Sequence, residues 1–362
     1  GGYFIDLRPF YEQSSETAYE NYYADMLSTA TNFGVLKKYS EDPSVNYGLW
    51  YAPRDYNQPT IYCNTSLFKK FDIAMPDPTV AGTWNLDAFL KLLKDINDAI
   101  AAKAAVSRDY SIYRAFNATL ASEEVYTPLV KAFGGDGITK EGAFNLDSPA
   151  NIAAMQKFDD AIYNVDASGN AQNKYIYSNT ATGFLNGTTF MVVAARPLLI
   201  NYSESLSIRN EELDFLPMPY EYNSAGNSGY GIISVHAEEE ITLDNGEKIK
   251  VKDACWDFLK FVITEEGQEI GSKLGSLVPV LKSLAENGSW KKWQEEKHLH
   301  HEYFVSDATI PLDQFDAFDP EKRLALRSDI DNFFQTYTSP LSSSNSAEQL
   351  AKTKELFNKD LK

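Results

Sequence analysis

Cysteine and histidine are scarce in this chain, and long apolar runs are absent. Among its 362 residues only two are cysteines and four are histidines. Cys63 and Cys255 each lie in an apolar or aromatic run, so we expect two buried free thiols rather than a disulfide framework. No apolar run approaches the ~20 residues that a membrane-spanning helix needs. These absences argue against a disulfide-stapled scaffold and against a membrane-embedded chain.

Positive charge is also in short supply. The formal net charge is −18, from 51 acidic and 33 basic residues. Such a charge repels phosphate backbones and anionic membranes, so we do not expect nucleic acid as a partner. The chain begins at Gly1 without Met or a signal peptide. We therefore expect a processed form or a fragment, and the sequence does not itself reveal export.

Signatures of catalysis and of cofactor binding are missing as well. The sequence has no G-x-S-x-G elbow, no P-loop and no dinucleotide-binding glycine pattern. The stretch HLHHE, with His298, His300 and His301, has no strict metal-ligand spacing and is interpreted as a solvated helix end or loop. A glycosidase-like carboxylate pair remains open among 51 acidic residues, but no pair stands out. We expect no catalytic residue, no metal and no cofactor.

Aromatic residues are abundant. The chain has 22 Tyr and 21 Phe. Tyrosine combines a rigid ring with a polar tip, which suits a partly wet recognition surface, although surface tyrosines without a ligand explain the number equally well. A length of 362 residues favours two lobes over one core, and a hydrophobic content of 43% is enough to build them.

Segments of helical and strand periodicity alternate along the chain, which indicates an α/β protein. Helices are expected over 85–106, from Ser148-Pro149, over 254–263, from Asp319-Pro320, and after the capping box of Ser346 and Gln349. Strands are expected over 189–195, 213–217 and 231–235, with a hairpin over 240–251 at Asn245-Gly246. The stretch 223–234 is interpreted as a flexible, hydrogen-bond-rich loop that leads into the strand at 231–235.

Several loose motifs occur in a characteristic order. They are GGYFIDLRPFYEQ, YAPRDYNQPTIYCNTSLFKKF, YTPLVKAFGGDGITKEGAFNLDSPANIAAM, FLNGTTFMVV, DACWDFLKFVITEEGQE and GSLVPVLKS. In this order they resemble the family 1 extracellular solute-binding proteins of ABC importers, of the maltodextrin- and oligosaccharide-binding type. Cys63, Thr188 and Thr189 depart from the usual residues. The family's further strand–helix–strand region before the first motif is absent from this chain.

The resemblance implies a type II, periplasmic-binding-protein-like α/β fold with two lobes and a ligand cleft between them. Residues 1–57 and 231–282 would form a first lobe that is incomplete. Residues 58–230 and 283–362 would form the second lobe. The chain would cross between lobes near 58–60, near 230–232 and near 283.

The resemblance further implies a receptor that captures a carbohydrate, expected to be an oligosaccharide, by lobe closure and delivers it to an ABC permease. The expected partners are the sugar and the permease subunits, and the protein is expected to be a monomer. The expected location is extracellular, as a cell-surface lipoprotein or in a periplasm. Three alternatives stay open: a receptor for a non-sugar solute such as a polyol or a small acid, a carbohydrate hydrolase, and a sensor partner.

Sugar rings stack on aromatic faces, and their hydroxyls need polar partners once water is excluded. By position within the resemblance, the expected ligand contacts are Trp50, Tyr51, Asp55, Asn57, Glu124, Tyr126, Arg196, Tyr202, Asn227 and Tyr230. Asp55 and Arg196 could instead pair with other charges. Trp84 and Trp256 are expected in a core, whereas Trp290 and Trp293 fit either packing or the rim of a cleft.

Overall fold

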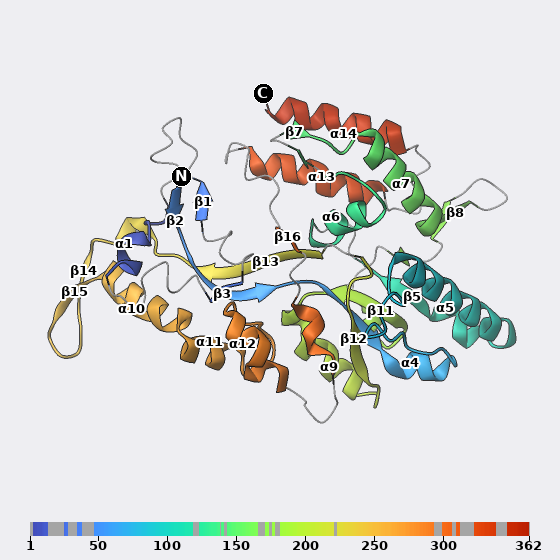
Figure 1. Ribbon diagram of the computed structural model, residues 1–362, viewed down its shortest axis with the longest axis horizontal. Helices are drawn as coiled ribbons and strands as arrows, with labels where there is room; N and C mark the ends of the chain where they lie inside the picture. The colour runs from blue at the N-terminus through green and yellow to red at the C-terminus, as the bar shows by residue number, and fades with distance from the viewer. Residues whose placement is uncertain are drawn as a thin grey trace. The chain divides into compact units, whose positions relative to one another are not determined.

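A computed structural model gives the mixed α/β fold of the chain (Figure 1). It describes residues 3–13, 25–27, 35–37, 47–118, 123–137, 139–140, 143–165, 171–173, 176–177, 182–220, 223–292, 299–305, 309–311, 322–337 and 346–361. Contacts divide the chain into two compact units. Unit 1 comprises Gly1–Asn57 and Ala225–Lys297, and unit 2 comprises Gln58–Ser224 and His298–Lys362.

Unit 1 is built from short strands and a run of helices. Its described elements are α1 (Arg8–Tyr11), β1 (Val35–Lys37), β2 (Tyr47–Leu49), β3 (Ala52–Asn57), most of β13 (Asn223–Tyr230), η4 (Ser234–His236), β14 (Glu240–Thr242), β15 (Lys248–Lys250), α10 (Val251–Ile263), α11 (Glu265–Ser272), α12 (Lys282–Asn287) and η5 (Ser289–Lys292). Strand β3 pairs with β13 in antiparallel fashion, as do β1 with β2 and β14 with β15.

The core of unit 1 forms beneath α10. Trp256, Leu259 and Ile263 recur at helical spacing and are all buried. The Trp256 ring packs against Phe10 and Tyr11 of α1, with ring centroids 5.5 and 4.9 Å apart. The prediction that Trp256 lies in a core is confirmed, and Trp290 is fully buried in η5.

Unit 2 is organised around a five-stranded sheet in the order β10-β5-β11-β4-β12. Its described elements are β4 (Thr60–Asn64), α4 (Thr65–Lys70), α5 (Leu86–Val106), η2 (Arg108–Ile112), β5 (Arg114–Asn117), α6 (Glu123–Ala132), β6 (Thr139–Lys140), β7 (Ala143–Phe144), α7 (Pro149–Ile162), β8 (Tyr163–Val165), β9 (Ala171–Asn173), β10 (Ile176–Tyr177), α8 (Thr182–Leu185), β11 (Thr189–Ala194), η3 (Arg196–Leu198), α9 (Leu199–Ser207), β12 (Leu213–Leu216), η7 (His301–Phe304), β16 (Thr309–Pro311), α13 (Arg323–Tyr337) and α14 (Ser346–Leu361).

The sheet of unit 2 mixes parallel and antiparallel pairs. Strand β11 runs parallel to β5 and antiparallel to β4, and β12 runs antiparallel to β4. Every residue of β4 and β11 is buried, which fits strands with both faces covered. Helix α5 buries Phe89, Leu93 and Ile96 against this core, and Trp84 packs at its edge. The helices α13 and α14 lie side by side (Figure 1).

Most of the elements expected from periodicity are present. The expected helices correspond to α5, α7, α10 and α14, and the expected strands at 189–195 and 213–217 correspond to β11 and β12. The hairpin is formed by β14 and β15, with Gly246 at a φ of 85° in its turn. The last helical segment before α14 begins at Arg323, and Asp319 and Pro320 lie outside the described residues.

The region 223–235 is a correction. The expected strand over 231–235 is instead a bridge residue and the turn η4, with Ile233 57% and Val235 71% exposed. The expected loop before it is the strand β13. Backbone pairing with β3 determines this outcome, because residues such as Asn, Ser and Gly favour strands only weakly by themselves.

One of the three boundaries between the compact units coincides with an expected lobe boundary, and the other two differ from the expected ones. The first lies after Asn57 in both. The second lies after Ser224 rather than Tyr230, because β13 pairs with β3 from Gly226 onward. The third lies after Lys297 rather than Lys282, because α12 and η5 contact α11. The lobe assignment itself stays a prediction.

Candidate functional site

Four of the predicted contact residues lie together on neighbouring segments of unit 1. Tyr51 and Asp55 lie just before and within β3, and Asn227 and Tyr230 lie on β13. The register places Ser228 opposite Asp55 and Tyr230 opposite Ala52. Together with Arg54 and Ser228, these four residues form a surface that we call the β3–β13 patch.

The Tyr51 ring is fixed against the backbone of β13. A Cβ atom at Gly229 would lie 2.3 Å from Tyr51 Cδ2 and 2.4 Å from the carbonyl oxygen of Ala52. Only glycine therefore lets the ring approach so closely. The Tyr51 hydroxyl donates a hydrogen bond to Asn227 Oδ1 at 2.7 Å. The strand therefore holds the ring along its Cδ2 and Cε2 atoms, and the amide holds its hydroxyl.

Asp55 organises the polar half of the patch. It is 2% exposed, and its Oδ1 accepts hydrogen bonds from the backbone nitrogen of Ser228 at 2.8 Å and from the Ser228 hydroxyl at 2.7 Å. Its Oδ2 forms an ion pair with Arg54 Nη2 at 2.7 Å. A buried carboxylate that is paired and hydrogen-bonded in this way acts as a structural anchor.

Arg54 and Tyr230 form the exposed edge of the patch. Arg54 is 36% exposed, and its guanidinium carbon lies 5.7 Å from the centre of the Tyr230 ring. Burial alone would lower the pKa of Arg54, but hydrogen bonds with Tyr230 and Asp55 raise it above its usual value. Tyr230 is 37% exposed and packs edge-on against Phe258 at 5.9 Å. The edge therefore keeps a permanent positive charge beside an accessible ring.

Two further predicted contacts lie beside the patch in sequence. Trp50 is half-buried and directly precedes Tyr51. Asn57 ends β3, and its Oδ1 atom is buried without a hydrogen-bond partner in the described part of the chain. An amide oxygen left without a partner is costly, which is consistent with a role in binding.

Tyr126 and Tyr202 do not lie on a surface. Tyr202 is 2% exposed and packs against Tyr62 and Phe184, with ring centroids 5.1 Å away in both cases, and burial raises its pKa to about 12. Tyr126 is fully buried, and its hydroxyl donates to Asp331 Oδ1 at 3.1 Å. Both rings lie in the interior of unit 2, because Tyr126 is on the buried face of α6 and Tyr202 is on the buried face of α9.

Arg196 is likewise interior. It is fully buried in η3, its Nη1 contacts His301 Nδ1 at 2.7 Å, and its guanidinium lies 4.8 Å from the centre of the Phe304 ring. Burial lowers its pKa to about 10, so it stays charged at neutral pH. Glu124 lies in α6, and its side chain falls outside the described residues.

Arg54 and Ser228 are the patch residues that the sequence did not single out. Arg54 directly precedes Asp55 in β3. A pair of opposite charges in a half-buried strand could have indicated a functional site. Ser228 carries no such signal, because its role follows from the register between β3 and β13.

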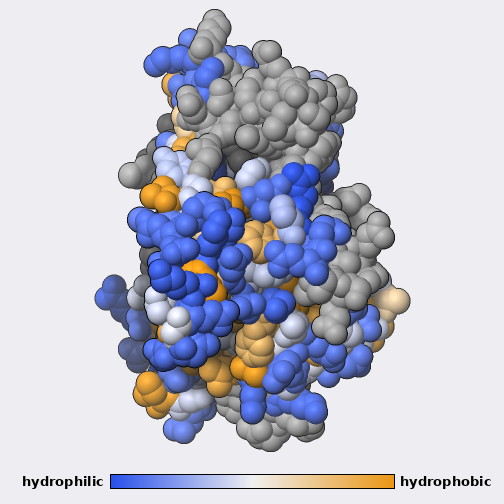
Figure 2. Space-filling view, turned by 90° about the vertical axis from the view of Figure 1, so that its left-hand side faces the viewer, coloured by the Kyte–Doolittle hydropathy of each residue, from blue (hydrophilic) through white to orange (hydrophobic). Residues whose placement is uncertain are grey.

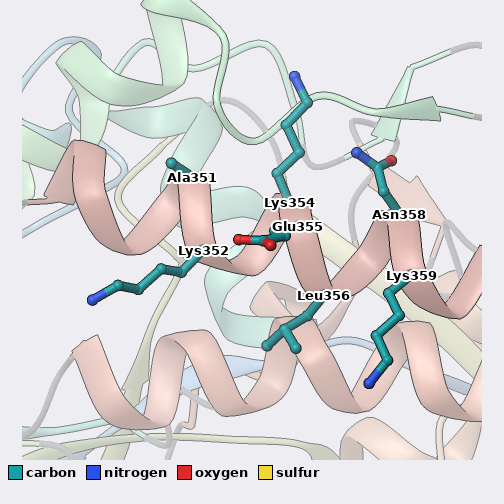
Figure 3. A pocket seen from close by; sticks show the side chains of 7 residues that line it. All are labelled: Ala351, Lys352, Lys354, Glu355, Leu356, Asn358 and Lys359. Carbon is teal, nitrogen blue, oxygen red and sulfur yellow. The ribbon is translucent and has the colours of Figure 1, made fainter.

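A separate hollow of about 810 Å³ lies along α14. It is lined by Ala351, Lys352, Lys354, Glu355, Leu356, Asn358 and Lys359. Figure 3 shows that these side chains all come from one helix and diverge from one another. Lys352 and Lys354 already pair with Glu348 and Asp147. This hollow therefore lacks the convergent groups of a binding site.

The surface that carries β14, β15 and α10 is mostly hydrophilic, with separate hydrophobic patches (Figure 2).

Among the described residues, no cluster of three or more His, Cys, Asp or Glu side chains could hold a metal ion. No described helix is long and apolar enough to cross a membrane. Cys63 and Cys255 are both free thiols. Cys63 is buried, and burial raises the pKa of its thiol. Cys255 is partly exposed, so only Cys63 meets the expectation of a buried thiol.

Comparison with solved structures shows the fold. The GacH receptor of Streptomyces glaucescens, solved with acarbose, matches at 15% identity with a TM-score of 0.63, over 99% of this chain and 79% of that one. UgpB of Mycobacterium tuberculosis, in complex with glycerophosphocholine, matches at 14% identity with a TM-score of 0.65, over 99% and 79%. The cyclic α-maltosyl-1,6-maltose binding protein of Arthrobacter globiformis matches at 16% identity with a TM-score of 0.63, over 99% and 80%.

No curated protein matches this chain in sequence. The family of bacterial extracellular solute-binding proteins, however, matches residues 6–298, which is most of the chain. The ordered motifs, the α/β units and the solved relatives agree with this match. The chain therefore belongs to the bacterial extracellular solute-binding proteins and has the two-lobe, periplasmic-binding-protein-like fold.

Proposed function

We propose that this protein is a non-catalytic receptor that captures a carbohydrate, specifically an oligosaccharide, and delivers it to an ABC permease. Family membership supports a solute receptor, and two of the solved relatives named above are associated with acarbose and with a cyclic maltosyl-maltose. The observation that carries the proposal is the Tyr51 ring held against Gly229 and hydrogen-bonded to Asn227.

Each group of the β3–β13 patch has a role in this proposal. The Tyr51 ring stacks on the apolar face of a sugar, and Tyr230 extends that aromatic surface. Asn227 and Arg54 bind sugar hydroxyls, which need paired polar groups once water is excluded. Asp55 and Ser228 are positioning residues that hold Arg54 and β13 in place. Trp50 and Asn57 remain proposed contacts.

The proposal extends to the whole receptor. Units 1 and 2 would be its two lobes, and a ligand would shift them toward a closed state by binding that state more tightly. We further propose a monomer outside the cytoplasmic membrane, either lipid-anchored at the cell surface or in a periplasm. Membership of an extracellular solute-binding family supports the proposed location.

Calorimetric titration against a solute panel tests this function. The panel contains maltotriose, a cyclic maltosyl tetrasaccharide, tagatose and glycerophosphocholine, and the recovered glycans are analysed for cleavage. We expect saturable binding of an oligosaccharide and intact glycans after incubation. Tight binding of glycerophosphocholine with no sugar binding contradicts the carbohydrate proposal, and cleaved glycans contradict the receptor proposal.

A receptor for an anionic, non-sugar solute is the second candidate, and one observation favours it. Arg54 presents a partly exposed guanidinium at the edge of the patch. The sequence suggested Arg196 for this role, but Arg196 is buried in unit 2. An Arg54→Gln variant that loses solute binding far more than a Tyr51→Ala variant would support this candidate.

A further inference from the structure

The segments of unit 2 that adjoin its boundaries with unit 1 are tied to one another. Gln58 Nε2 and Thr60 Oγ1, which follow the first boundary, donate hydrogen bonds to the carbonyl oxygen of Tyr303 at 3.2 and 2.9 Å. Asn223, which precedes the second boundary, donates from Nδ2 to the carbonyl oxygen of Pro59 at 2.9 Å. Tyr303 lies on η7, shortly after the third boundary. These bonds therefore join, within unit 2, segments that lie next to all three boundaries in the sequence.

Turn η7 owes its position to Arg196 and to a group of aromatic rings. Arg196 Nη1 lies 2.7 Å from His301 Nδ1, and the Arg196 guanidinium lies over the Phe304 ring. Phe304 packs edge-on against Phe215 and Tyr62, at centroid distances of 4.9 and 5.7 Å. Arg196 and Phe304 are fully buried and His301 is 3% exposed.

The contact between Arg196 and His301 requires a neutral imidazole. A guanidinium can only donate hydrogen bonds, so His301 Nδ1 must accept with its lone pair. A proton on Nδ1 would remove that lone pair and would place two cations 2.7 Å apart in a buried site. The bond is therefore present only while His301 is neutral.

We propose that Arg196 and His301 form an acid-sensitive clamp, which fixes turn η7 and through it the crossing segments of unit 2, and which opens when His301 is protonated. Arg196 and His301 are thus positioning residues for the hinge rather than ligand contacts. The clamp lies wholly within unit 2 and does not depend on the identity of the solute.

Charged and titratable groups of the described residues surround the clamp and turn η7. Tyr62 on β4 lies near Arg196 and Tyr202, whereas Asp77 after α4, Asp214 on β12 and Glu302 lie near His300 or Tyr303. Asp214 faces His300: its Oδ1 accepts from the His300 backbone nitrogen at 3.1 Å, and its Oδ2 lies 2.9 Å from His300 Nδ1. At His301, the Arg196 guanidinium contacts Nδ1, so a proton on that atom would break this contact.

The sign of the pH effect follows from which state binds the proton. In the unfolded chain His301 is protonated below about pH 6.5, whereas the clamp excludes that proton. Because the unfolded state then binds more protons, stability is fully present above about pH 6.5 and falls as the pH is lowered. The clamp contributes a shift of up to ~10-fold in the unfolding equilibrium per pH unit below that value.

The test uses the ligand-free full chain, so it is independent of the proposed solute. Urea unfolding is measured between pH 7.5 and pH 5 for the wild type, His301→Gln and His300→Gln. Glutamine has an amide oxygen that can accept from Arg196, and it does not titrate. We expect His301→Gln to lose most of the acid-induced destabilisation seen in the wild type. We expect His300→Gln to retain it, since His300 is 44% exposed and faces a carboxylate.

A second measurement covers the case in which the variants fold poorly. Imidazole ¹⁵N spectra of the wild type assign the protonation of each His301 nitrogen, and hydrogen exchange follows residues 299–305. We expect an unprotonated Nδ1 at pH 7.5, and a loss of protection at pH 5.5 after correction for intrinsic rates. Equal pH slopes in the wild type and His301→Gln, or a protonated Nδ1 at pH 7.5, overturns the proposal.

Discussion

Gly229 illustrates how one missing side chain organises the candidate site. The Tyr51 ring occupies the space where a Cβ would lie, and the chain shifts register between Ser228 and Gly229. Such a bulge locally bends a strand and re-aims its side chains, which makes it common beside binding sites. The position of Tyr51 therefore depends on a residue that contributes no contact of its own.

A Gly229→Ala substitution should destabilise unit 1 by about 1–3 kcal/mol, because the new methyl group forces the Tyr51 ring or the β3 backbone to move. Gly271→Ala is the matched control. It lies in α11 with no atom within 4 Å of the added Cβ, so it should be neutral or stabilise by up to about 1 kcal/mol. Urea unfolding measures both; equal effects of the two substitutions would contradict this account of Gly229.

Individual contact residues were the least predictable feature. Tyr51, Asp55, Asn227 and Tyr230 meet on one patch, as their positions near a chain crossing suggested. Arg196 also lies at the end of a strand, yet it is buried, because the turn η7 from far along the chain covers it. A local pattern reports which residues are adjacent in sequence, and it does not report what later segments pack over them.

At the scale of elements, helices followed from sequence more directly than strands. Helix α5 fills the expected range 85–106, with Asn85 as its N-cap, and it buries Phe89, Leu93 and Ile96. Strand β13 was missed because Asn, Ser and Gly carry little strand preference, and only pairing with β3 makes it a strand. Helices carry their own backbone hydrogen bonds, whereas a strand depends on a partner that the local sequence does not name.

Two asparagine caps in the described part of unit 2, Asn64 and Asn85, should differ in their effect on stability. Asn64 caps α4 by accepting from the Leu67 nitrogen at 3.2 Å and also donates to Glu211 at 2.9 Å, and it is fully buried. Asn85 caps α5 through the Ala88 nitrogen at 2.9 Å and is exposed. We expect Asn64→Ala to cost about 2–3 kcal/mol and Asn85→Ala about 1 kcal/mol.

Chemical denaturation measures both cap variants, with Asn85→Ala as the reference for a cap alone. The excess cost of Asn64→Ala reports the buried bond to Glu211, which loses its partner in the variant. A cost for Asn64→Ala no larger than that for Asn85→Ala would show that burial adds nothing to this cap.

At the scale of the whole molecule, the order of motifs was more informative than any single motif. Each motif is loose, but their order along the chain identified the family that residues 6–298 match. The crossing expected near 58–60 is adjacent to the first boundary between the contact units, which lies after Asn57, and the lobe assignment stays a prediction. The later boundaries depend on which helices pack on which strands, so they emerge only from the three-dimensional contacts.

The central claim is that the β3–β13 patch binds the sugar. Calorimetry of Tyr51→Ala with the oligosaccharide of the panel that the wild type binds tests it most directly. Tyr202→Phe is the control, because Tyr202 lies in the interior of unit 2. The account predicts that Tyr51→Ala weakens affinity about tenfold or more, which is ~1.4 kcal/mol, and that Tyr202→Phe leaves it within about twofold. Unchanged affinity in Tyr51→Ala, or no binding of any oligosaccharide of the panel by the wild type, would contradict it.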